Sequence, residues 1–276
     1  MRRPRLGSTM RTLMLAIACI AAATSVPAAA PTDDLARYPV SGRRSGYTYL
    51  SPETRAQQKD EFANPGMLWV EQGERLWSLV PDKSKAQAQS CVGCHGDAAK
   101  SMRGVAARYP AFDRGEGHVV SLEHRINACR VKKQGATPFA WESQGLLAMT
   151  AYVSRQSLDM PVSVKVTGPA ARSFERGRTA YYQRRGQLDM ACAHCHEERT
   201  GARLRAEVIS QGQINGHPVY RQLWQTMGSA QRMFAWCNDA VRADPYAYGS
   251  QEYTDLELFV KWRGRGLPVE TPAIRR

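Results

Sequence analysis

Two short cysteine motifs carry the clearest chemical information in this sequence. The pentapeptide CVGCH occupies residues 91–95, and CAHCH occupies residues 192–196, beginning 101 residues later. Two thiols spaced in this way can each add to one vinyl group of the same porphyrin, and the adjacent histidine can reach the iron. The sequence therefore predicts two covalently bound haem c groups. Their thiols are Cys91, Cys94, Cys192 and Cys195, and their proximal iron ligands are His95 and His196.

The alternative for these motifs is a zinc or redox site, because Cys-x-x-Cys also serves those functions. A zinc site that used all four thiols would leave His95 and His196 unexplained. We therefore favour haem attachment at both motifs. His194, inside the second motif, is expected to face the surface or to support the site without binding iron.

Each half of the chain also contains one further cysteine after its motif. Cys129 follows His95 by 34 residues, and Cys237 follows His196 by 41 residues. The matching intervals favour one shared role, and thiolate is a strong anionic donor that stabilises ferric iron. We predict that both cysteines are axial iron ligands. The alternatives are buried apolar roles, a disulfide between the two, or methionine ligation by Met102, Met149, Met160, Met227 or Met233.

The N-terminus has the features of a secretory signal peptide. Four arginines precede a short apolar run at residues 13–24, and small residues follow up to position 30. The run is too short for a membrane span, so we expect residues 1–30 to be removed and the mature chain to have no span. Because residues 1–30 hold four arginines and no acids, the formal charge of +13 falls by four to +9. This charge suits anionic partners, but no nucleic-acid-binding module is recognisable.

The remaining sequence suggests an arm followed by two similar domains. Residues 31–64 are polar and rich in Pro, Gly and Arg, which indicates an extended arm that packs on a domain or on a partner. Apolar spacing then predicts helices over residues 67–80, 121–131 and 144–153. In the second half, residues 224–241 and the apolar stretch from Ser250 correspond to the last two of these helices.

The order of features supports an internal duplication. Gly73 and Gly177 each precede a motif, Cys129 and Cys237 each follow one, and each half closes on a proline, Pro161 or Pro268. A period near 100 residues corresponds to a whole domain and not to a solenoid repeat. We therefore predict a mainly α protein with two tandem cytochrome c-type domains, at residues 65–163 and 164–276.

With these features placed, the chain resembles the SoxA family, the dihaem subunits of the SoxAX cytochromes of thiosulfate oxidation. The resemblance covers residues from about 65 to the end, and its most specific stretch is RMFAWCNDAVRADPY at residues 232–246. In that family, the cysteine that matches Cys237 ligates the second haem, carries a persulfide sulfur and is the active-site residue. The resemblance thus implies that Cys237 is catalytic.

The resemblance also implies an activity, partners and a location. Family members act in the periplasm with a monohaem cytochrome, SoxX, and join thiosulfate oxidatively to a cysteine of the carrier SoxYZ. This reaction is L-cysteine S-thiosulfotransferase activity, and its electrons pass to cytochrome c. We expect the same heterodimer, carrier substrate and electron-accepting cytochrome here.

Arginines near Cys237 are candidates for binding the thiosulfate dianion, because the guanidinium fork matches an oxyanion. Arg232 lies five residues before Cys237, and Arg242 lies five residues after it. Neither spacing places the arginine squarely on the cysteine's face of a helix. The family's substrate arginine lies about one turn before the cysteine, where this chain has Met233. Arg232 and Arg242 are our candidates, with solvated surface charge as the alternative.

Two other functions are compatible with a dihaem cytochrome. A plain electron carrier would use methionine as the sixth ligand and perform no catalysis. A dihaem peroxidase would need an open or displaceable His-ligated iron, and it gives no reason for the paired Cys129 and Cys237.

Overall fold

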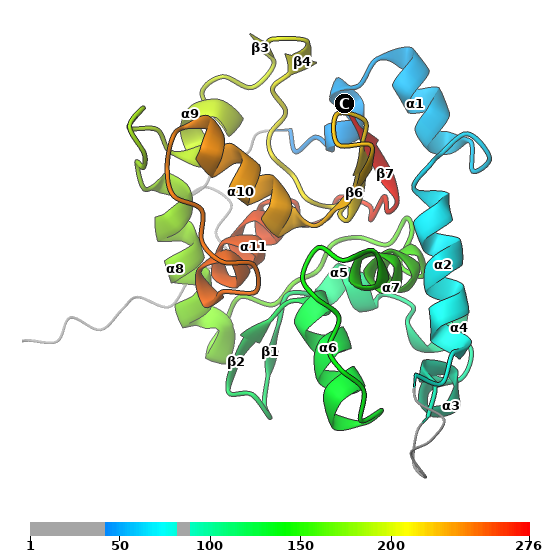
Figure 1. Ribbon diagram of the computed structural model, residues 1–276. Coiled ribbons are helices and arrows are strands. Elements are labelled where there is room, and N and C mark those ends of the chain that lie inside the picture. The colour runs from blue at the N-terminus through cyan, green and yellow to red at the C-terminus, as the bar shows by residue number, and fades with distance from the viewer. Residues whose placement is uncertain (1–41, 82–88) are drawn as a thin grey trace, which may run out of the picture.

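A computed structural model describes residues 42–81 and 89–276 (Figure 1). The signal peptide expected at residues 1–30, and the beginning of the expected arm at 31–41, lie outside the described residues. The described chain is largely helical with a few short strands, which confirms the predicted mainly α class. None of the described helices is both long and apolar enough to cross a membrane.

The first part of the chain is built on two packed helices, α2 (Met67–Ser78) and α7 (Gln144–Arg155). On α2, the buried residues Val70, Gly73 and Trp77 share one face at helical spacing. Gly73 allows a very close approach, since a Cβ there would lie 2.2 Å from the carbonyl oxygen of Ala148. The glycine is therefore required by the packing of α2 against α7.

The elements between these two helices carry the first motif and Cys129. The motif forms α3 (Cys91–His95), followed by α4 (Ala98–Ser101) and α5 (Val105–Arg108). An antiparallel hairpin of β1 (Ala111–Asp113) and β2 (His118–Val120) then leads into α6 (Leu122–Lys132), which contains Cys129. The Ser121 side chain caps this helix by accepting a hydrogen bond from the backbone N–H of His124.

The second part uses the same kind of helix pair, α8 (Ala171–Tyr182) and α11 (Gln251–Arg263), preceded by the short helix η3 (Gly168–Ala170). Gly177 is the contact point, because a Cβ there would lie 1.9 Å from the carbonyl oxygen of Asp255. The interface is mainly aromatic, with Phe174 of α8 packing edge-on against Trp262 of α11 at a centroid distance of 4.9 Å. Gly73 and Gly177 therefore have equivalent packing roles.

The second motif forms α9 (Cys192–His196), and α10 (Ala230–Ala240) contains Cys237. Two small sheets lie between and after them. β3 (Arg203–Leu204) pairs with β4 (Glu207–Val208), and β5 (Val219–Arg221) lies between the antiparallel β6 (Thr226–Gly228) and the parallel β7 (Ala273–Arg275).

The helix predicted over residues 224–241 begins later than expected. Residues 226–228 form strand β6, and the helix starts at Ala230, where Ser229 accepts a hydrogen bond from the backbone N–H of Arg232. Residues 226–228 pair with β5 and are therefore not part of the helix. The sequence-based prediction missed the strand because the apolar spacing continues across it.

Residues 42–64 differ from the extended arm predicted for residues 31–64. They form η2 (Gly46–Tyr49) and α1 (Pro52–Lys59), and they pack on the second part of the same chain. The Ser45 hydroxyl donates to Glu270 at 2.6 Å, and Asn64 Nδ2 donates to the Pro272 carbonyl at 2.9 Å. Intramolecular hydrogen bonds therefore fix this stretch beside β7, as Figure 1 also shows.

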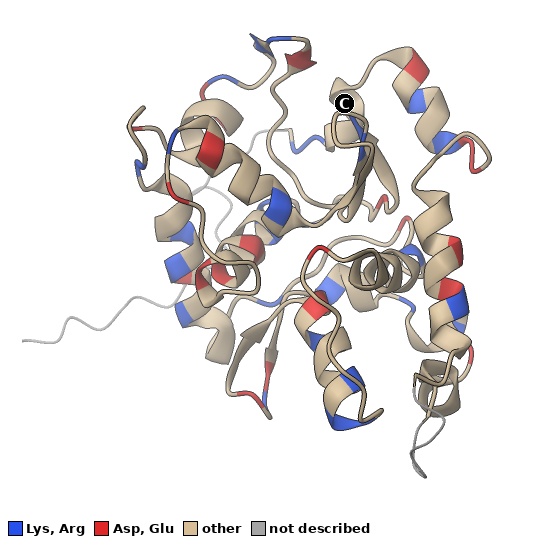
Figure 2. Cartoon of the chain, viewed as in Figure 1, with Lys and Arg blue, Asp and Glu red and all other residues tan. Residues whose placement is uncertain are grey.

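The two parts share core contacts. Val119 of β2 belongs to the apolar cluster of α8 and α11, and Met227 of β6 packs with Val70 and Leu147 of the first helix pair. The prolines that close the halves, Pro161 and Pro268, face each other in an isolated antiparallel bridge. Figure 2 shows Lys and Arg positions spread along the chain, among them positions on α6, α8 and the β3–β4 hairpin.

Candidate functional site

The second motif is held as one turn of helix by its own histidine. His194 Nδ1 accepts a hydrogen bond from the backbone N–H of Ala191 at 2.8 Å, in place of a capping serine. The corresponding position before the first motif is Ser90, whose hydroxyl accepts from the N–H of Gly93 at 3.1 Å. His194 thus has a local structural role at the start of this helix.

His196 is oriented by the loop that follows β4. Its Nδ1 lies 2.8 Å from the carbonyl oxygen of Ser210, so Nδ1 carries the hydrogen and Nε2 remains available as a ligand. Gly212, with φ of +70°, lies against the ring, and a Cβ there would be 2.8 Å from His196 Cγ. Burial lowers the pKa of His196, which favours the neutral form that binds iron.

Cys237 faces the thiols of the second motif. Burial raises the pKa of Cys237 to about 12, and negative charge on Cys192 and Cys195 acts in the same direction. Burial also raises the pKa of Cys192 to about 11. Both motif cysteines and Cys237 have free thiols. A thiol in such surroundings ionises only beside a positive charge, which is the environment that an iron centre provides.

The side chains of the second motif and of Cys237 therefore fit a haem group. Cys192 and Cys195 are free for covalent attachment, His196 has an available Nε2, and Cys237 lies on the helix that faces them. Arg263, only 1% exposed, braces the motif by donating to the Gln211 carbonyl at 2.9 Å and pairing with Glu197 at 3.1 Å. Its charge also contributes to lowering the pKa of His196.

Arg221 is the arginine whose charge acts on Cys237, and the sequence analysis missed it. It lies at the end of β5, is 8% exposed in its side chain, and pairs with Glu207 at 2.8 Å. Its guanidinium carbon lies 5.3 Å from the Trp224 ring centroid and 5.5 Å from that of Trp236. Its Nε has no hydrogen-bond partner within the described chain. The charge of Arg221 lowers the pKa of Cys237, opposing the effect of burial.

The two arginines proposed from the sequence lie in different environments. The Arg232 guanidinium carbon stacks 4.4 Å from the same Trp224 ring, and its Nη1 donates to the Met227 carbonyl at 3.4 Å. Arg232 and Arg221 therefore flank one tryptophan. Arg242 lies in a turn with φ of +57° and donates to the exposed Gln187 at 3.4 Å. Within the described part of the chain, Arg242 has no recorded contact with Trp224 or Trp236, which we call the tryptophan cluster.

The first motif is more open than the second. His95 and Cys94 are exposed, whereas Cys91 is half-buried. Trp77 of α2 lies beside the histidine, with a ring-centroid distance of 5.8 Å, and its Nε1 donates to the Gly96 carbonyl at 3.1 Å. Burial raises the pKa of Cys91, and negative charge on Cys129 also raises it. Cys129 therefore lies near the first motif thiol, as Cys237 lies near the second.

The structure also bears on the alternatives. The six described cysteines are all free, so Cys129 and Cys237 do not form a disulfide. Among residues 42–81 and 89–276, no cluster of three or more His, Cys, Asp or Glu side chains is arranged to hold a metal ion. Met149 and Met102 pack in the apolar cluster that also contains Cys91, whereas Met227 packs with Val70 and Leu147.

Comparison with known proteins gives consistent similarities. The family described as "SoxA/TsdA, cytochrome c domain" matches residues 72–162. The chain is 41% identical over 240 residues to "L-cysteine S-thiosulfotransferase subunit SoxA" of Pseudaminobacter salicylatoxidans, covering 87% of this chain and 83% of that protein. It is 40% identical over 232 residues to the protein of that name from Rhodovulum sulfidophilum, covering 84% and 80%.

A solved structure supports the same relationship. The chain aligns with the crystal structure of SoxXA from P. pantotrophus with a TM-score of 0.80 at 38% identity, covering 84% of this chain and 86% of that chain. The fold, the matched residues and the extent of identity agree, and the chain belongs to the SoxA family of cytochromes.

Proposed function

We propose that this chain is the catalytic subunit of a thiosulfate-oxidising complex and joins thiosulfate to a cysteine of a carrier protein. This is L-cysteine S-thiosulfotransferase activity. The observation that carries the proposal is the position of Cys237, on a helix that faces the second motif thiols and beside the buried cation Arg221. The names of the relatives support the same activity.

Two haem c groups would be held by the motif cysteines, and each would supply a one-electron redox centre when bound. Cys91 and Cys94 would hold the first, and Cys192 and Cys195 the second. His95 with Cys129, and His196 with Cys237, would be the axial iron ligands. The cytochrome c family match and the free state of all six described cysteines support this assignment.

Arg221 would act with Arg232 to attract the thiosulfate dianion. Their guanidinium carbons both lie near the Trp224 ring, at 5.3 and 4.4 Å from its centroid. Arg221 is buried and pairs with Glu207 at 2.8 Å, while its Nε has no partner among the described residues. Water therefore screens the remaining positive charge poorly. Arg242, the other arginine predicted from the sequence, would contribute only to the field at the surface.

Cys237 would be the active-site residue, present as a cysteine persulfide. The overall reaction joins the terminal sulfur of thiosulfate to the carrier cysteine sulfur. One S–S bond forms, the carrier thiol loses its proton to solvent, and two electrons leave the sulfur atoms. The half-buried position of Cys237 excludes bulk water from the reacting sulfur, while the exposed Trp236 next to it marks the side from which a carrier would approach.

The chain would work in a complex. We propose a heterodimer with a monohaem SoxX-like cytochrome, a SoxYZ-like carrier as the sulfur acceptor, and a cytochrome c as the final electron acceptor. The similarity to the chain of the SoxXA crystal structure supports the first partner. We also propose that residues 1–30 are a signal peptide and that the mature chain works in the periplasm.

Internal duplication would explain the repeated architecture, with domains at residues 65–163 and 164–276. Each half has a glycine-mediated helix pair, a motif helix, a hairpin, and a serine-capped helix that carries Cys129 or Cys237.

The direct test is reconstitution. The haem-loaded complex, a carrier and thiosulfate are mixed with an oxidised cytochrome c. The expected results are a mass increase of one thiosulfate on the carrier and two equivalents of reduced cytochrome. Reduction of the cytochrome without modification of the carrier would contradict the proposed transferase.

A further inference from the structure

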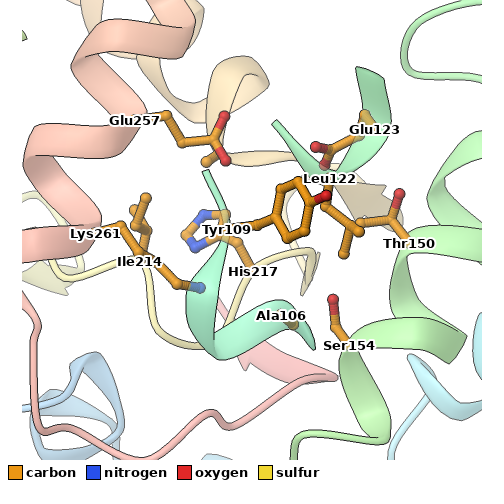
Figure 3. A pocket seen from close by; sticks show the side chains of 11 residues that line it. Ala106, Tyr109, Leu122, Glu123, Thr150, Ser154, Ile214, His217, Glu257 and Lys261 are labelled. Atoms are coloured by element: carbon orange, nitrogen blue, oxygen red, sulfur yellow. The ribbon is translucent and has the colours of Figure 1, made fainter. Parts of the chain in front are cut away.

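A small polar cavity lies where the two parts of the chain meet, lined by residues other than those of either motif (Figure 3). Its volume is about 30 Å³. The first part contributes Tyr109, Glu123 and Thr150, and the second contributes His217, Glu257 and Lys261. Ionisable side chains are rarely buried without a partner, so this concentration of them inside the protein needs an explanation.

Several polar atoms at the cavity have no partner within the described chain. The Thr150 hydroxyl is unpaired although the residue is 2% exposed, and neither ring nitrogen of His217 has a partner. Lys261 is 6% exposed and forms no ion pair with the residues that the structure describes. Buried polar groups of this kind bind water, and the volume accommodates about two molecules.

The charges in the cavity do not balance when every group is ionised. Glu123 and Glu257 supply two negative charges, and Lys261 supplies one positive charge. Burial lowers the pKa of His217 to about 3, so its ring is neutral. Burial, followed by the charge of Glu123, raises the pKa of Glu257, whereas Gln231 and Lys261 lower it. Glu257 is therefore the group that can accept a proton when its surroundings become more negative. Tyr109 is the remaining titratable group that lines the cavity.

The cavity is connected to both proposed iron sites by continuous helices. On α6, Glu123 precedes Cys129 by six residues, and on α10, Gln231 precedes Cys237 by six residues. Gln231 Nε2 donates to Glu257 at 3.3 Å. Six residues of helix span about 9 Å. One charge at Glu257 is thus placed between the two cysteine-bearing helices.

We propose that this cavity binds ordered water and one exchangeable proton on Glu257, and that occupancy by the proton is coupled to the redox state of both haem sites. Adding one electron to either site makes the surroundings more negative. The Glu257 carboxylate then takes a proton from bulk water and becomes the neutral acid. Glu257 is partly exposed, which gives the proton a route to solvent. The proposal goes beyond the transferase activity and depends on haem binding alone.

The first test measures the midpoint potentials of the haem-loaded complex as a function of pH. If reduction favours protonation of Glu257, then protonation must favour reduction by the same factor. Both midpoint potentials should therefore fall as the pH rises and the proton is lost. Between the protonated and the deprotonated state of Glu257, the equilibrium constant for reducing each site should change by at least about fivefold. This factor is the lower end of the usual coupling between two sites. Glu257→Gln should abolish the pH dependence, and the exposed Glu252→Gln, on the same helix, should retain it. A flat wild-type profile, or a slope that survives in Glu257→Gln, would overturn the proposal.

The second test detects the proton directly in the wild-type complex. Infrared difference spectra between reduced and oxidised protein should contain a carboxylic-acid carbonyl band that shifts in D₂O. Thr150→Val, which removes one water partner without changing a charge, should move this band while thiosulfate turnover persists. Absence of the band in the wild-type protein would overturn the proposal even if Glu257→Gln fails to fold. Loss of transferase activity with the band intact would contradict only the proposed function.

Discussion

His196 Nδ1 lies 2.8 Å from the Ser210 carbonyl oxygen, and Gly212, two residues later, lies against the same imidazole ring. One short loop therefore fixes both the tautomer and the position of the proposed proximal ligand. A ring that cannot rotate presents Nε2 in one direction only. The orientation of His196 in the proposed second haem site is consequently set by residues 210–212 as much as by the motif itself.

Gly212→Ala should disturb this site. The new Cβ would lie 2.8 Å from His196 Cγ, at a position with φ of +70°. We expect an altered absorption spectrum for the second haem. Gly201→Ala is the matched control, because its φ is +88° and nothing lies within 4 Å of its Cβ. It adds similar backbone strain, about 1–2 kcal/mol, without touching the ring. Equal spectral changes in both variants would contradict the positioning role of Gly212.

Two haem groups should be attached to one mature chain. The double variant Cys192→Ala, Cys195→Ala should lose one of them and retain the other through Cys91 and Cys94. Intact-mass measurement of the purified chain counts the attached groups directly. The reciprocal variant, Cys91→Ala with Cys94→Ala, is the control for the first motif. Retention of two groups in either double variant would contradict the assignment of the motifs.

The helix pairs of both halves should fail when their glycines are enlarged. A Cβ at Gly73 or Gly177 would lie 2.2 or 1.9 Å from a backbone carbonyl oxygen of the partner helix. Overpacking of this kind costs about 1–3 kcal/mol, more than the roughly 1 kcal/mol that alanine gains in helix propensity. Denaturant unfolding should therefore show a lower free energy for Gly73→Ala and Gly177→Ala.

Gly115→Ala is the comparison, since its nearest neighbour, a side-chain oxygen of Asp113, would lie 3.3 Å away. Its free energy of unfolding should stay within about 0.5 kcal/mol of the original. Wild-type stability in Gly177→Ala would show that α8 and α11 are not packed as described.

We expect Arg221 to contribute more to thiosulfate turnover than Arg232 or Arg242, the two arginines proposed from their spacing to Cys237. Its charge acts on Cys237 and its side chain is 8% exposed, whereas Arg242 lies in a surface turn and contacts Gln187. Loss of a charged hydrogen-bond donor costs about 1.5–3 kcal/mol, which is roughly 10- to 100-fold in kcat/KM. We expect that loss for Arg221→Gln, a smaller loss for Arg232→Gln, and little change for Arg242→Gln. Steady-state kinetics with varied thiosulfate would rank them, and a larger effect of Arg242→Gln would contradict this order.

The sequence was sufficient for local features that depend on neighbouring residues. Helix α7 begins after Ser143 and α11 after Ser250, both of which cap their helices, and the apolar spacing located these segments. Arg221 could not be predicted, because it lies 16 residues before Cys237 and is brought near it only by the pairing of β5 with β6, the strand that precedes and contacts α10. The sequence indicated an arm packed on a domain or on a partner, but it could not specify the position beside β7, because the hydrogen bonds concerned join residues more than 200 positions apart.

The most direct test of the central claim compares Cys237→Ala with Cys129→Met in the same assay. Both cysteines lie near a motif thiol, but only Cys237 has the Arg221 and tryptophan cluster beside it. Thiosulfate-dependent reduction of cytochrome c is measured with the SoxX-like partner and the carrier both present. Cys237→Ala should keep both haem groups and lose conjugation of thiosulfate to the carrier, while Cys129→Met should change the spectrum of the first haem and retain substantial turnover. Normal turnover in Cys237→Ala would contradict the catalytic role of Cys237.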